Sequence, residues 1–126
     1  IQLICTIASI PSPTGREQEK AKWILQYLHD LGAHEAYIDE AGNVLFPWNV
    51  DASRPVPLYN AHIDTVFNQL DTITPAITGN ILAAPSCGDN SSSVAGLLFF
   101  IRMMRELSIV PYRHFVCLQC RRGGFG

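Results

Sequence analysis

Apolar residues recur along residues 18–31 at the spacing of one buried helix face. They are Ala21, Ile24, Leu25, Leu28 and Leu31. Gly32 follows them, and because glycine adopts positive φ without strain, we expect it to end this helix. Thr14 and Glu17 stand three residues apart before the apolar stripe, which predicts a capping box at the start of the helix. The pattern therefore predicts one amphipathic helix after a proline-containing loop.

Strand-like runs follow this helix. Residues 34–48, HEAYIDEAGNVLFPW, predict two short strands around a turn at AGN. Residues 54–62, RPVPLYNAH, predict a strand whose two prolines stand where it begins, where a missing N–H does least harm. Residues 73–86, ITPAITGNILAAPS, predict a hairpin that turns at Gly79 and Asn80.

A second helix precedes the last predicted strand. Residues 91–108, SSSVAGLLFFIRMMRELS, are apolar on nearly every side, so this helix is expected between layers or under a sheet. Residues 112–120, YRHFVCLQC, predict a strand. The order strand, helix, strand predicts an α/β fold with parallel strands and right-handed crossovers.

Composition narrows the class of protein. The chain has 126 residues, 48% of them hydrophobic and 16% charged, which indicates one globular domain with a buried core. A net charge of -2 offers no basic surface for nucleic acid. No apolar run reaches the roughly 18 residues of a membrane span, so no membrane partner is expected. Four sparse cysteines argue against a disulfide framework and favour reduced thiols in a cytoplasmic protein.

His62 and Asp64 are the first residues that suggest chemistry. They alternate with Ile63 at the end of a predicted strand, so both side chains are expected on the same side. A neutral imidazole is a good zinc ligand, and a nearby carboxylate can hold its second nitrogen. A loop histidine beside a turn-forming aspartate is the alternative, and the pair alone favours that alternative because short motifs often occur by chance.

Asp89 supplies the second candidate, in the stretch CGDNSSSVAGLL. A carboxylate at a helix N-terminus is favourable by itself, without any ligand. In an α/β sheet, however, Asp89 and His62 would both lie at the carboxyl edge, where such proteins place their sites. A carboxylate there can bridge two metal ions that activate water for hydrolysis.

The motifs NAHIDTV and, about 25 residues further on, CGDNSSSVAGLL resemble a zinc metallopeptidase family. This family includes tripeptide aminopeptidase (peptidase T), succinyl-diaminopimelate desuccinylase, acetylornithine deacetylase and aminoacylase-1. The opening IPSPTGREQEKAKWILQYLHDLG and the turn IDEAGNVLF are similar to that family as well. The resemblance implies a three-layer α/β catalytic domain with a mixed, largely parallel sheet between helices. Residues 1–126 would be its N-terminal portion, with the rest of the catalytic domain and the dimerisation domain absent.

The same resemblance implies roles for three residues. His62 would bind one zinc ion, Asp89 would bridge two, and Asp64 would orient His62 or tune the catalytic base. Cobalt or manganese could take the place of zinc, because affinity and availability decide the metal as much as ligand type. The substrate would be a short peptide or an N-acyl amino acid, and the full-length protein would be a homodimer.

The family pattern breaks at CLQCRRGGFG. Arg122 and Gly123 stand where the family has a pair of glutamates, the first a proton carrier and the second a zinc ligand. Arginine offers no lone pair and glycine no side chain, so we expect the chain as written to be inactive. One explanation is a compensated frameshift over residues 119–123, since suitable codons shifted by one base, with one G then restored, read Asn-Val-Gly-Glu-Glu-Gly-Phe-Gly. The alternative is a non-catalytic homologue whose old cleft, with Arg121 and Arg122, binds peptides or partners.

Overall fold

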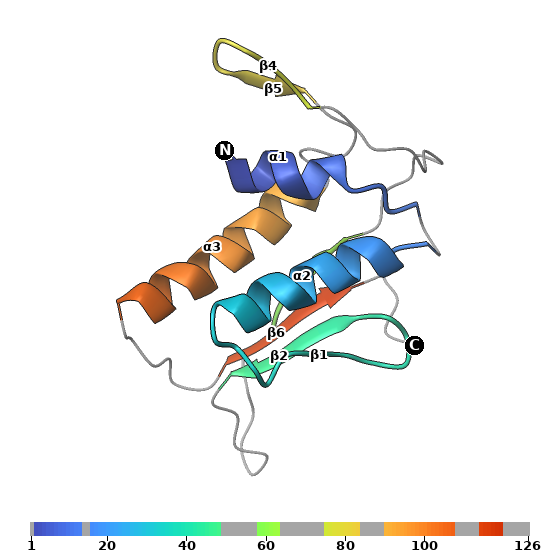
Figure 1. Cartoon of the computed structure of the whole chain (residues 1–126), viewed down its shortest axis with the longest axis vertical. Coiled ribbons are helices and arrows are strands. Elements are labelled where there is room, and N and C mark those ends of the chain that lie inside the picture. The colour runs from blue at the N-terminus through green and yellow to red at the C-terminus, as the bar shows by residue number, and fades with distance from the viewer. Residues whose placement is uncertain are drawn as a thin grey trace.

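The computed structural model describes residues 2–13, 16–48, 58–63, 75–83, 90–107 and 114–119. Its elements along the chain are α1 (Gln2–Ser9), α2 (Gln18–Asp30), β1 (Tyr37–Ile38), β2 (Val44–Trp48), β3 (Leu58–His62), β4 (Ala76–Thr78), β5 (Ile81–Ala83), α3 (Ser92–Glu106) and β6 (His114–Gln119). Two helices come first, five strands follow, and α3 stands before the last strand (Figure 1). The α/β class is confirmed, whereas α1 was not predicted from the sequence.

Four strands form one mixed sheet in the order β1-β2-β6-β3. The β1–β2 and β2–β6 pairs are antiparallel, whereas β3 and β6 are parallel and joined through α3. The predicted strand-helix-strand unit with parallel strands is therefore confirmed. The ladder between β3 and β6 runs from Leu58 opposite Phe115 to His62 opposite Gln119. β4 and β5 form a separate antiparallel hairpin that turns at Gly79, as predicted (Figure 1).

Helix α2 ends as predicted but starts differently. Gly32 has φ 91° just after the last turn, so its lack of a Cβ allows the chain to leave the helix. At the other end, Glu17 occupies the N-cap position and its side chain makes no capping hydrogen bond. A capping box needs this glutamate three residues inside the helix, so that prediction is wrong. Thr14 lies outside the described residues.

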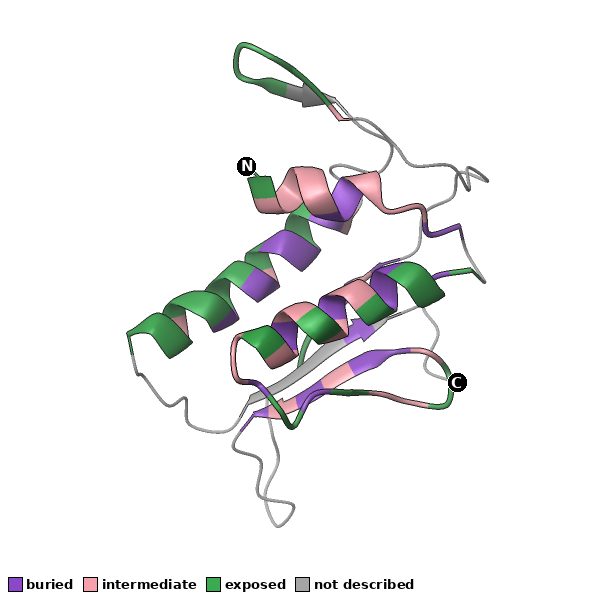
Figure 2. Cartoon of the chain, viewed as in Figure 1, coloured by how far each residue is buried: buried purple, intermediate pink, exposed green. Residues whose placement is uncertain are grey.

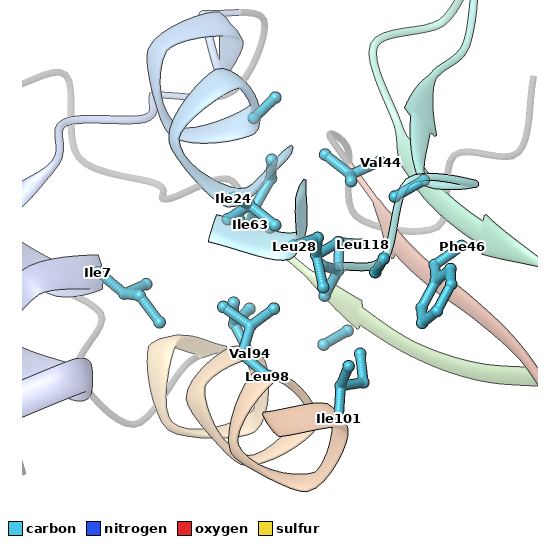
Figure 3. Close-up of a cluster of buried hydrophobic side chains, with 14 of the residues drawn as sticks. Ile7, Ile24, Leu28, Val44, Phe46, Ile63, Val94, Leu98, Ile101 and Leu118 are labelled. Carbon is cyan, nitrogen blue, oxygen red and sulfur yellow. The ribbon is translucent and has the colours of Figure 1, made fainter. Parts of the chain in front are cut away.

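The helices pack on one face of the sheet and enclose a single apolar core (Figures 2 and 3). Alternate residues of β2 face this core, as the two-residue period of a strand requires. The most deeply buried large apolar side chains are Ile7, Ile24, Leu28, Val44, Phe46, Val94, Leu98, Ile101 and Leu118. Each buried side chain of this size stabilises the fold by roughly 1.5–3 kcal/mol relative to exposure.

Helix α3 has two apolar faces with different surroundings. Val94, Ala95, Leu98 and Ile101 are buried against the core. The opposite face carries large apolar side chains that are exposed in the described structure: Phe99, Phe100, Met103 and Leu107. The prediction that α3 packs against the sheet is confirmed for its buried face.

The turn between β1 and β2 is closed by Asp39. Its Oδ1 accepts hydrogen bonds from the backbone N–H groups of Ala41 (3.0 Å) and Asn43 (2.9 Å). Its Oδ2 accepts one from the Asn43 side-chain amide at 3.0 Å. Gly42 has φ 91°, which explains a glycine at this position. The predicted turn at AGN is confirmed.

Candidate functional site

His62 is the last residue of β3, at the carboxyl end of a strand parallel to β6. Its neighbours Ala61 and Ile63 are 3% and 2% exposed, whereas His62 itself is half-buried. The core therefore holds the backbone on both sides of His62 while leaving the histidine partly accessible. This is the edge of an α/β sheet where ligands usually bind.

Four segments of the chain meet at His62 and line a narrow pocket that leaves no room for a water molecule. The lining residues are Ile7, Lys20, His62, Ile63, Asn90, Ser91 and Val94. They come from α1, α2, the end of β3 and the start of α3. The pocket thus brings the strand end that carries His62 together with the N-terminal end of α3.

Asp64 and Asp89 lie outside the described residues, as do Arg121, Arg122 and Gly123. In the sequence, Asp64 directly follows Ile63 and Asp89 directly precedes Asn90, and both of these neighbours line the pocket. Within the described ranges no three His, Cys, Asp or Glu side chains gather as a metal site. Among the described residues that line the pocket, the histidine is His62, and its imidazole is a suitable ligand for a divalent metal.

Lys20 is a pocket residue that the sequence analysis missed. It is 1% exposed, which is rare for lysine, whose ammonium group normally stays in water. Its spacing offers a signal, because Lys20 stands four residues before the buried Ile24 and eight before the buried Leu28. Positions four apart share one helix face, so a buried lysine could have been inferred from that row.

Ser12 is the second residue that the sequence analysis missed. It is 1% exposed, and its hydroxyl donates a hydrogen bond of 2.7 Å to the backbone carbonyl of Ile63. The contact joins residues 51 positions apart in the chain. No local pattern could have predicted it, because its partner is set by how α1, α2 and β3 come together.

The fold is that of the catalytic domain of M20 family metallopeptidases. The structure matches a metallo-carboxypeptidase of this family from Sulfolobus solfataricus with a TM-score of 0.72, at 17% identity over 92% of this chain and 29% of that one. It matches a tripeptidase from Staphylococcus aureus with a TM-score of 0.77, at 18% identity over 93% of this chain and 34% of that one.

A sequence relative supports the same assignment. The chain is 34% identical over 99 residues to a protein of Pyrococcus abyssi provisionally named LysW-lysine/LysW-ornithine hydrolase. This match covers 79% of the present chain but 28% of the relative. No protein-family model matches the chain. The resemblance to the metallopeptidase family that the motifs indicate is confirmed, and its relatives and structural neighbours are hydrolases.

The chain spans about a third or less of the length of these proteins. The comparisons therefore concern part of each of these longer proteins. None of the helices in the described ranges is long and apolar enough to cross a membrane.

Proposed function

We propose that residues 1–126 are the N-terminal portion of the catalytic domain of a metal-dependent hydrolase that cleaves amide bonds. The observation that carries this proposal is the pocket shared by His62, at the carboxyl end of β3, and Asn90, the residue after Asp89. Parallel strands of an α/β sheet deliver site residues to this edge. The match to the M20 family fold supports the proposal independently of the pocket.

In this proposal His62 and Asp89 hold divalent metal, zinc with two ions in the complete site, or cobalt or manganese. A bound zinc ion supplies water activation, because it lowers the pKa of its water to about 7. Asp64 orients His62 or tunes the catalytic base. The half-buried position of His62 suits a ligand that must be fixed in direction yet accessible to solvent.

The substrate in this proposal is a short peptide or an N-acyl amino acid. Relatives named for hydrolysis of LysW-lysine and of tripeptides support this class. The sparse cysteines support the cytoplasm as the compartment. The full-length protein is expected to be a homodimer.

The chain as written is proposed to be inactive, because Arg122 and Gly123 replace the glutamates that the family uses. Zinc at catalytic sites normally has three protein ligands, more than His62 and Asp89 together provide. Sequencing the coding DNA for residues 119–123 tests the frameshift explanation. A Glu-Glu reading would support it, whereas confirmed codons for Arg122 and Gly123 would leave the non-catalytic alternative.

Metal binding tests the proposed site directly. Zinc titration followed by calorimetry should give a measurable affinity for the wild-type chain and a loss of at least about tenfold for His62→Ala, since a ligand is removed. His34→Ala is the matched control, because His34 is an exposed histidine outside the pocket. Equal zinc affinity in His62→Ala and His34→Ala would overturn the assignment of His62.

A variant that restores the two glutamates distinguishes the hydrolase from the non-catalytic homologue. Arg122→Glu combined with Gly123→Glu returns a carboxylate ligand and removes a positive charge, so it should raise zinc affinity by at least about tenfold. Turnover of short peptides by the 126-residue wild type would contradict the proposed inactivity. Binding of acidic peptides without any zinc binding would instead establish the non-catalytic alternative.

A further inference from the structure

We draw no further inference here: the strongest candidate, the exposed apolar face of α3 formed by Phe99, Phe100, Met103 and Leu107 beside the groove that α3 lines with α1, carries nothing, because nothing among the described residues shows what covers it.

Discussion

The turn after β1 and the end of β3 are both held by hydrogen bonds to side chains, but the partners lie at very different distances along the chain. In the turn, the Asp39 carboxylate accepts hydrogen bonds from Ala41 and Asn43, all within five residues. At the strand end, the carbonyl of Ile63 depends on Ser12, 51 residues away. The first structure needs only its own segment, whereas the second exists only once α1, α2 and β3 have packed together.

This difference bears on which of the two regions can carry a function that depends on the whole fold. A turn closed by its own side chains is stable but cannot respond to the rest of the molecule. The pocket at His62 is lined by residues from four segments, so its shape depends on the whole core. Substitutions within the turn should therefore affect the turn alone, whereas substitutions in the core should also change the pocket.

Truncation of Leu98 should have the largest effect. Leu98 is 0% exposed on the face of α3 that meets the core, and Leu98→Ala should lower the free energy of unfolding by about 3 kcal/mol through lost burial and a cavity. Chemical denaturation measures this. Leu107→Ala, at a residue 61% exposed, is the control and should stay within about 0.5 kcal/mol.

The same variant also tests the comparison between the two regions. NMR shifts of residues 90, 91 and 62 should change in Leu98→Ala, because α3 carries one wall of the pocket. Shifts of residues 39–43 should not. A core substitution that disturbs the turn as much as the pocket would show that the turn is not locally determined.

Removal of the Asp39 carboxylate should have the second-largest effect on the free energy of unfolding. Asp39→Ala leaves the backbone and side-chain N–H groups of Asn43 without this acceptor, and Asn43 is 2% exposed. We expect a loss of about 2 kcal/mol in the free energy of unfolding. Asp39→Asn keeps one acceptor oxygen and should lose less. Zinc affinity should be unchanged in both variants, and a loss of zinc binding would contradict the separation of turn and site.

Substitution of Gly42 should have the smallest effect. Its φ of 91° is unfavourable for any residue with a Cβ, so Gly42→Ala should lower the free energy of unfolding by about 1 kcal/mol. Gly96→Ala is the matched control, since Gly96 lies in α3 with open space where the methyl group of an alanine would stand. That variant should stabilise the protein by up to about 1 kcal/mol, because alanine favours helix. The same sign for both variants would contradict the role of positive φ.

Several elements of this fold were readable from sequence because their determining contacts are local, although helix α1 was not predicted. The stripe through Ile24 and Leu28, the end of α2 at Gly32 and the turn at Gly42 all follow from period, backbone angle and nearby side chains. The capping box failed because Glu17 stands at the N-cap itself, a shift of a few residues that composition does not reveal.

The pocket was readable only in part. His62 could be named because its strand run and the Asp that follows it are contiguous in the sequence. Ser12 could not, since its hydrogen bond spans distant segments. The insertion of β6 between β2 and β3 was equally hidden, because pairing partners along a sheet are chosen by tertiary packing rather than by sequence neighbourhood.

The central position of β6 has a consequence for synthesis on the ribosome. β2 and β3 leave the ribosome well before β6, which is separated from β3 by about 50 residues. At typical translation rates this gap lasts roughly 3–10 s. During that time neither strand has β6 beside it, and both present an open edge to other chains. The nascent protein therefore passes through a window in which chaperones, rather than its own fold, protect it from aggregation.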